Sequence, residues 1–504
     1  MSALALQMAR VVQGFTRDHC VLFLVGVGLS IAQFIMIRDF VTVLYGEEVV
    51  IVLVTAAFLA GLSVGYVLSL RLAGHVFKHL FIISVFLHLT FPLSYRYLAA
   101  WFAQMNAGGA AYLALLFTYA LLFSSIFAAF LPRLVSLAAT GGSEEERLKT
   151  FYTVELIGFV AGFVVIGSTW NHPLIYLLPV YWLILAILLH LVVWKPAVTA
   201  AYVVAATVAC LSLNHTDIHS TQLLYEYKHH WRAPTVLYSV NSPYQKVEVI
   251  DDGRGGRSLY LDGLENLNST DLEGLNFYIA QVPAALLRPD RTLIIGNGTL
   301  SSVPKVYPYS GEVISVELDP AVLEAGRLFF TPPEKLKGLN RWKLHVDDGK
   351  HFLMQSEDTY DLIIMDVPSP LTIQEAFLHT VEFYQLAQSR LNERGVIAVQ
   401  LSGDLERNNR TPARVVAALR EAFPEVMVIS SPRADRGFAY ASMTLPFTAA
   451  DVRRESQAYE QKISVIPPSR VRRYLKNATP LSVDHLDLVL RRGLERFLGR
   501  YFDD

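Results

Sequence analysis

The pattern of apolar and polar positions divides this chain into two parts. Up to about residue 215, long apolar stretches follow one another with few charged positions, and most approach the ~20 residues that a helix needs to cross a bilayer. Beyond a polar segment, shorter apolar runs alternate with turn-forming residues, which is typical of strands and helices in alternation. The pattern therefore predicts an N-terminal α-helical integral membrane bundle followed by an α/β domain.

The N-terminal part contains seven apolar stretches that we interpret as membrane spans. Gly61 and Gly65, and again Gly158 and Gly162, are four residues apart, a spacing that lets helices pack closely. Glu155 lies within an apolar stretch, where an ionisable side chain is costly. We expect tight packing of the bundle, with a polar transport or binding site inside it as the alternative. The predicted spans are Val21–Ile37, Val49–Leu70, Leu80–Tyr95, Ala110–Leu131, Phe151–Thr169, Leu174–Trp194 and Ala197–Leu213.

Changes in pattern also set the expected domain boundaries. Period-two alternation in VLYSV, KVEVID and SLYLDG, broken by the glycine-rich DDGRGG, predicts a small β-sheet ahead of the α/β core. The Arg-rich C-terminal tail is typical of amphipathic helices. The predicted parts are a transmembrane domain (1–215), a linker (216–234), a small β domain (235–291), a Rossmann-like domain (292–445) and a C-terminal helical extension (446–504).

Glycines or acids follow four apolar runs of the predicted Rossmann-like domain. TLII leads to Gly296 and Gly298, and the next runs end near Glu317, Asp348 and Asp366. The carboxyl ends of parallel strands meet at one edge of a sheet, where glycines let a ligand approach the backbone and a carboxylate can accept hydrogen bonds from a ribose. Any one of these acids, taken singly, is equally explained as a helix N-cap or a solvated strand end. Together they predict a nucleoside-type site.

Eight short segments between residues 236 and 445 resemble the spermidine synthase (polyamine aminopropyltransferase) family in order and spacing. They are SPYQKVEVID, LYLDG, LIIGNG, VELDP, DDG, DLIIMD, EFY and RGFAYAS. The resemblance implies aminopropyl transfer from decarboxylated S-adenosylmethionine to a polyamine or another amine, without a tightly bound cofactor, in a protein that tends to form homodimers. It implies that the nucleoside is bound by Gln245, Gly296, Gly298, Glu317 and Asp348. Asp366 would accept a proton from the attacking amine or orient it.

Several positions depart from that family's pattern. Thr299 stands where the family has an Asp that holds the amine of the donor. Leu275 and Asn276 replace a Tyr and a His of the amine site, although Tyr278 takes one of these roles if the alignment shifts, and Ser369 replaces a second acid. A cationic polyamine needs carboxylates and ring faces around it. The nucleoside half of the site is thus retained and the amine half is altered.

Three functions are compatible with these features. The first is a membrane-anchored aminopropyltransferase. The second is a catalytically inactive synthase-like domain that binds a ligand and serves a membrane complex or transport, and the third is a methyltransferase that uses S-adenosylmethionine. The formal net charge of −2 and the lack of a basic, aromatic-rich patch argue against nucleic acid. Since Cys20 and Cys210 are the only cysteines and lie at or within apolar spans, no metal site is predicted.

Orientation in the membrane is the point on which the sequence conflicts with itself. The apolar content of 53% favours integration into the plasma (inner) membrane. With seven spans, the basic loops place the N-terminus in the cytoplasm and the C-terminal domain outside. An S-adenosylmethionine derivative is expected in the cytoplasm, so the side that the soluble domain faces stays undecided.

Overall fold

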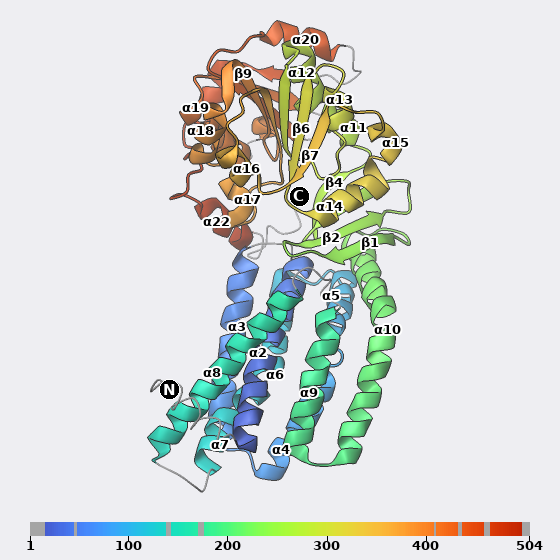
Figure 1. Cartoon of the computed structure of the whole chain (residues 1–504), viewed down its shortest axis with the longest axis vertical. Helices are drawn as coiled ribbons and strands as arrows, with labels where there is room; N and C mark the ends of the chain where they lie inside the picture. Colours follow the sequence, from blue (N-terminus) through green and yellow to red (C-terminus); the bar gives the residue numbers. More distant parts are fainter. Residues whose placement is uncertain are drawn as a thin grey trace, which may run out of the picture. The chain divides into compact units, whose positions relative to one another are not determined.

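The computed structural model describes residues 16–44, 48–137, 143–169, 176–407, 410–431, 436–457 and 464–495. By their internal contacts these residues form two compact units. One unit is helical and consists mainly of residues 1–243, and the other is an α/β unit that consists mainly of residues 244–504. Figure 1 shows the helical unit in blue to green and the α/β unit in green to red.

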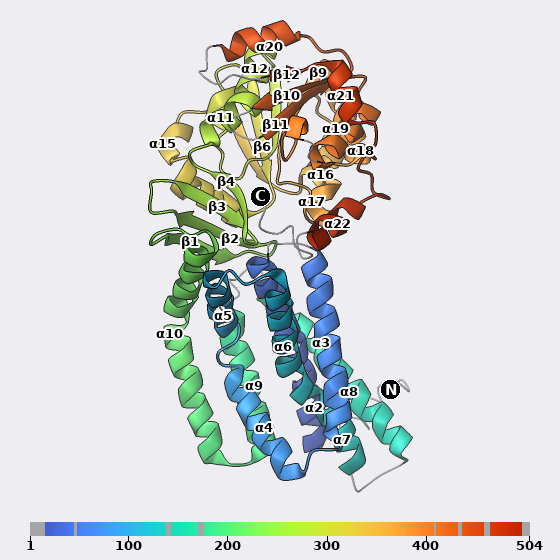
Figure 2. The ribbon, with the colours of Figure 1, turned by 180° about the vertical axis from the view of Figure 1, so that it is seen from behind.

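Helices of the helical unit run side by side, as Figures 1 and 2 show from opposite directions. Within the described residues, five helices are long and apolar enough by length and composition to cross a membrane, counting α6 with α7 as one, while α4 and α9 are apolar but shorter. The helices are α2 (Arg17–Val43), α3 (Glu48–Ser69), α4 (Gly74–Leu87), α5 (Leu93–Gln104), α6 (Gly109–Ala128), α7 (Phe130–Leu137), α8 (Glu144–Ser168), α9 (Leu177–Val193) and α10 (Pro196–Lys228).

The predicted close packing through small residues is confirmed. A Cβ atom on Gly65 would lie 2.0 Å from the carbonyl oxygen of Ser125 in α6. One on Gly158 would lie 2.1 Å from the carbonyl oxygen of Phe23 in α2. Only glycine allows backbones to approach this closely, so these residues bring α3 against α6 and α8 against α2.

Two predicted segments of this unit differ from the structure. The prediction of one uninterrupted helix over Leu80–Tyr95 is wrong, since α4 ends at Leu87 and α5 begins at Leu93. Pro92 stands at the break, where it lacks an N–H group and disfavours helical backbone before it. The predicted linker is mostly helix, because α10 continues to Lys228. No proline or glycine interrupts residues 214–228.

The α/β unit contains an eight-stranded sheet with the order β12-β10-β11-β9-β8-β5-β6-β7. Strands β5 to β9 are parallel, and β10, β11 and β12 complete the sheet in antiparallel pairs. The chain runs from β5 outward to β7 and then returns to β8 on the other side of β5, which creates a topological switch point. The strands are β5 (Arg291–Gly296), β6 (Glu312–Glu317), β7 (Trp342–Val346), β8 (Tyr360–Asp366), β9 (Leu391–Gln400), β10 (Glu425–Ser431), β11 (Arg436–Ser442) and β12 (Ser464–Ile466).

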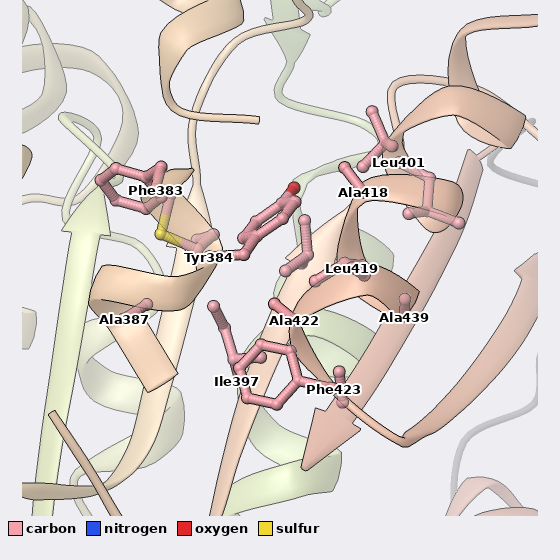
Figure 3. Close-up of a cluster of buried hydrophobic side chains, with 14 of the residues drawn as sticks. Phe383, Tyr384, Ala387, Ile397, Leu401, Ala418, Leu419, Ala422, Phe423 and Ala439 are labelled. Atoms are coloured by element: carbon pink, nitrogen blue, oxygen red, sulfur yellow. The ribbon is translucent and has the colours of Figure 1, made fainter. Parts of the chain in front are cut away.

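A hydrophobic core lies on each face of this sheet because side chains alternate along a strand. Leu293 and Ile295 of β5 belong to one core and Ile294 to the other. Figure 3 shows part of the first core, where α18 and α19 pack against β9 and β11 through Tyr384 and Phe423. The helices are α11 (Leu272–Asn276), η2 (Phe277–Gln281), α12 (Val282–Leu287), α13 (Val303–Val306), α14 (Pro320–Ala325), η3 (Gly326–Phe330), α15 (Pro333–Leu336), α16 (Gly349–Gln355), α17 (Ile373–Phe377), α18 (Val381–Ser389), η4 (Leu405–Arg407), α19 (Arg410–Ala422), α20 (Ala449–Ser456), α21 (Pro468–Tyr474) and α22 (Asp487–Glu495).

The predicted small sheet has four strands in the order β1-β2-β3-β4. The DDGRGG segment forms the turn between β2 and β3, with φ of +71° at Gly253 and +94° at Gly255. Apolar residues of this sheet, such as Val249 and Leu259, pack against Val322 in α14. This contact fixes the small sheet beside the loop that follows β6. Its strands are β1 (Thr235–Asn241), β2 (Lys246–Asp251), β3 (Arg257–Leu261) and β4 (Leu264–Asn268).

The C-terminal extension was predicted to be helical, and the structure departs from this in one place. Residues Ser464–Ile466 form β12 and pair with β10 at the end of the large sheet. Val465 and Ile466 in this run are apolar and β-branched, which suits a strand more than a helix. The end of the Arg-rich tail, residues 496–504, lies outside the described residues.

Candidate functional site

Three of the predicted nucleoside-site residues meet beside the loop after β6. The Oε1 atom of Glu317 accepts a hydrogen bond from the backbone N–H of Asp319 at 3.0 Å. The Nε2 atom of Gln245, just before β2, donates to Oδ2 of Asp319 at 3.2 Å. A Cβ atom on Gly298 would lie 3.2 Å from Oε2 of Glu317 and 2.3 Å from Val322. Gln245, Gly298 and Glu317 therefore lie together around Asp319, which itself caps α14.

The other glycine of the loop after β5 lies against β8. Gly296 has a φ of +81°, and a Cβ atom there would lie 2.3 Å from the carbonyl oxygen of Asp366. That oxygen also accepts a hydrogen bond of 2.9 Å from the N–H of Asn297. Since β5 and β8 are the neighbours at the switch point, the glycine loop and Asp366 form the centre of this edge of the sheet.

Asp348 follows β7, one strand further out than Glu317. Its Oδ1 atom accepts a hydrogen bond of 2.8 Å from the N–H of His351 and caps α16. The preceding acid, Asp347, is hydrogen-bonded to the ring of His351 at 2.9 Å. Asp348 thus lies at the same edge of the sheet, and its side chain caps a helix. The sequence analysis had left this capping role open for each of the acids.

Burial raises the pKa of the two central acids. Glu317 is buried, which raises the pKa of its carboxyl from 4.5 to about 7, although the N–H groups of Asp319 and Leu318 act in the opposite direction. Burial also raises the pKa of Asp366 from 3.8 to about 6, while Arg436 and a hydrogen bond from Ser302 oppose this. A carboxyl that changes its protonation state near neutral pH is typical of a functional site. Asp366 is thereby suited to accept a proton from an ammonium group.

Positions that depart from the family pattern are occupied in a different way. Leu275 and the ring of Tyr278 are buried in the hydrophobic core on one face of the sheet, and the Tyr278 ring packs against Phe438 at 5.7 Å. The Tyr278 ring thus contributes to packing in this core. Asn276 accepts a hydrogen bond of 2.8 Å from Ser302. The same Ser302 hydroxyl lies close to Asp366.

Thr299 and Ser369 also have local roles. The hydroxyl of Thr299 donates to Oδ1 of Asn297 at 2.9 Å and lies 2.7 Å from the hydroxyl of Ser301. The carbonyl oxygen of Ser369 accepts a hydrogen bond of 2.7 Å from the N–H of Leu371. Both residues therefore take part in local hydrogen bonds as neutral groups.

Two residues that the sequence did not single out contribute to this region. His379 lies 3.0 Å through Nε2 from the carbonyl oxygen of Pro368 and 3.2 Å through Nδ1 from the hydroxyl of Tyr384. Burial lowers its pKa to about 4, so the ring is neutral and holds the loop after β8. Arg436 begins β11, where pairing of Phe438 with Gln400 brings it to the carboxyl end of β9. RGFAYAS was singled out only as one of the segments that resemble the family, and its first residue was the available signal.

These elements define a class of protein. A parallel sheet with a switch point, a glycine turn after the first core strand and acids after the second and fourth are the features of an α/β domain that binds a nucleotide or nucleoside. Among the described residues, no cluster of three or more His, Cys, Asp or Glu side chains could hold a metal ion.

Comparison with known proteins specifies the family. The model of the spermine/spermidine synthase domain matches residues 275–434. A polyamine aminopropyltransferase of Alkaliphilus metalliredigens is 31% identical over 219 residues, which are 42% of this chain and 76% of the relative. One from Leptospira biflexa is 26% identical over 256 residues, covering 50% of this chain and 86% of the relative. The crystal structure of spermidine synthase from Thermotoga maritima matches with 22% identity and a TM-score of 0.42, over 48% of this chain and 87% of that one.

This chain belongs to the spermine/spermidine synthase family. The relatives match its C-terminal half, and the resemblance predicted from the short segments is confirmed.

Proposed function

We propose that this protein is a membrane-anchored transferase that moves an aminopropyl-type group from a sulfonium nucleoside to an amine. The donor used by the family is decarboxylated S-adenosylmethionine, and the relatives are named polyamine aminopropyltransferases. The observation that carries the proposal is the arrangement at the carboxyl edge of β5, β6 and β8, where the glycine loop lies between Glu317 and Asp366.

Each proposed role follows from this geometry. Gly296 and Gly298 let the loop after β5 pack closely against β8 and α14, which sets the backbone that the nucleoside would approach. Glu317 accepts hydrogen bonds from its ribose hydroxyls, supported by Gln245. Asp348 binds the base side of the nucleoside at the end of β7. Asp366 orients the attacking amine and takes up its proton, for which the raised pKa is suitable.

The helical unit supports membrane anchoring through its five long apolar helices. We propose the plasma (inner) membrane as its location, with the α/β unit facing the cytoplasm, where the donor is made. A reporter fused after Asp504 that is active in only one compartment tests this. Activity of a periplasmic reporter would exclude the proposed orientation.

The enzymatic proposal is tested with the full-length protein in detergent. Release of methylthioadenosine is measured with decarboxylated S-adenosylmethionine or S-adenosylmethionine as donor and putrescine or spermidine as acceptor. Wild-type protein should release the nucleoside, and Asp366→Asn should reduce the rate at least about 100-fold while it still binds methylthioadenosine. Nucleoside binding without turnover in the wild type would instead favour a binding domain without catalysis.

A further inference from the structure

The loop between β5 and α13 contains a buried hydrogen-bond donor that is not used within the described protein. Asn297 is 6% exposed, and its Nδ2 atom has no hydrogen-bond partner. An unsatisfied buried N–H group costs free energy, so such a group in a native structure points to an unseen partner. This donor lies between Gly296 and Gly298, at the centre of the proposed nucleoside site.

The orientation of the Asn297 amide is fixed by its neighbours. Its Oδ1 atom accepts from the backbone N–H of Ser301 at 3.2 Å and from the hydroxyl of Thr299 at 2.9 Å. A backbone N–H group can only donate, so the atom that faces it must be the oxygen and the NH₂ group must point the other way. The partner expected for the NH₂ group is therefore an acceptor, such as a carboxylate.

One departure from the family pattern removes a negative charge near the Asn297 amide. The family's Asp that holds the donor's amine is replaced by Thr299, whose hydroxyl is engaged by Asn297 and Ser301. The guanidinium of Arg436 faces Asp366 and is held by the carbonyl oxygen of Asn266 at 3.3 Å. Relative to the family pattern, this loop has lost a carboxylate that would repel an acidic tail and presents an amide donor that would bind one.

We infer that the donor site of this protein takes a sulfonium nucleoside that retains its carboxylate, S-adenosylmethionine, with the Nδ2 atom of Asn297 as a specificity-determining contact to that carboxylate. The inference rests on the proposed function and names its donor. The transferred group is then 3-amino-3-carboxypropyl in place of aminopropyl.

The reaction needs no further reactant. The lone pair of the acceptor amine forms a bond to the methylene carbon next to the sulfonium, and the bond from that carbon to sulfur breaks with its electrons on sulfur. Methylthioadenosine leaves, the proton of the amine passes to Asp366, and the carboxylate stays on the transferred chain. A methyl transfer would release S-adenosylhomocysteine, so the nucleoside product separates the two reactions.

The test measures binding to the full-length protein in detergent by titration calorimetry. The ligands are methylthioadenosine, S-adenosylmethionine and decarboxylated S-adenosylmethionine. We expect methylthioadenosine to bind, and S-adenosylmethionine to bind at least about tenfold more tightly than its decarboxylated form, the effect of one well-placed hydrogen bond to a charge. Failure of methylthioadenosine to bind would refute the proposed function. If methylthioadenosine binds, but decarboxylated S-adenosylmethionine binds as tightly as S-adenosylmethionine or more tightly, only the further inference is refuted.

Asn297→Asp is the decisive variant because it keeps Oδ1 and exchanges the NH₂ group for a carboxylate oxygen. Asp is also tolerated at the φ of +59° found at this position. The preference should reverse by at least about tenfold in favour of the decarboxylated donor, with an unchanged circular dichroism spectrum as a check of folding. Thr299→Asp should act in the same direction. Asn340→Asp, at an exposed position before β7, adds the same charge away from the site and is the control for net charge. If neither Asn297→Asp nor Thr299→Asp reverses the preference between the two donors, the inference is overturned.

Discussion

Glu317→Gln should make the α/β unit more stable at alkaline pH. In the folded protein the pKa of this carboxyl is about 7, against 4.5 for an unperturbed Glu. The ionised form is therefore disfavoured in the fold, and the difference corresponds to about 3 kcal/mol. Gln resembles the protonated carboxyl, since it is neutral and its oxygen can still accept the N–H of Asp319. The variant avoids the cost of a buried charge and should gain about this amount.

The sign of the pH dependence follows from linkage. The folded state holds a proton on Glu317 that the unfolded state releases between pH 4.5 and about 7, so wild-type stability falls across this range as pH rises. The gain from Gln should be complete at pH 8.5 and should shrink below about 1 kcal/mol at pH 5.

Hydrogen–deuterium exchange of peptides from β5 and β6 measures this effect in the full-length protein. At pH 8.5 the variant's core amides should exchange about two orders of magnitude more slowly than those of the wild type. Glu312→Gln is the matched control on the same strand. Hydrogen bonding to Lys343 lowers the pKa of Glu312, so this change should destabilise the unit by at most about 1 kcal/mol. Equal or faster exchange in Glu317→Gln at pH 8.5 would refute the reasoning.

Three further changes test the packing. Gly296→Ala should destabilise the α/β unit by about 2 kcal/mol or more, because the added methyl would lie 2.3 Å from a backbone oxygen of β8 at a φ of +81°. Gly338→Ala has a similar φ of +82° but open space around it and should cost only about 1 kcal/mol in the same exchange experiment. Arg96→Met should lower the thermal unfolding temperature of the helical unit, since it leaves Asp39 buried without its 2.7 Å ion pair at a cost of about 3 kcal/mol. Adding Asp39→Asn should recover part of that loss, and no recovery would argue against the ion pair as the cause. Phe423→Ala should cost about 3 to 5 kcal/mol by chemical denaturation, because the ring is 1% exposed in the core of Figure 3.

Periodicity predicted the centre of the α/β unit because β5, β6 and β8 are apolar runs that end at glycine or acid. The same reasoning failed where apolar content continued across a helix break. Residues 80–95 are mostly apolar, and hydropathy does not register Pro92, whose effect on the backbone separates α4 from α5. At the other end of the bundle, the polar residues after Leu213 suggested a linker, although polarity does not end a helix that lacks proline or glycine.

The sequence predicted the acids of the candidate site but not the residues around them. Acids at strand ends are visible in a sequence because parallel strands bring their carboxyl ends to one edge. Ser302 and Arg436 come from segments far apart in the chain, and only the register of β11 on β9 and the position of α13 bring them near Asp366. The free Nδ2 atom of Asn297 could not be predicted either, since it depends on which side of the amide Ser301 approaches.

Burial also raises the pKa of Glu375, which caps α17, so a raised pKa does not by itself separate functional from structural acids in the α/β unit. Glu248 is buried but paired with Lys246 at 2.8 Å, and Asp404 is buried with the hydroxyl of Ser430 at 2.6 Å. These acids are satisfied within the fold. Glu317 and Asp366 instead have pKa values raised by burial and lie next to an unsatisfied amide donor in the glycine loop. Buried carboxyl groups and an unsatisfied N–H donor at one edge of the sheet lower the free energy of unfolding of the α/β unit. A bound ligand that hydrogen-bonds to these groups would raise it again.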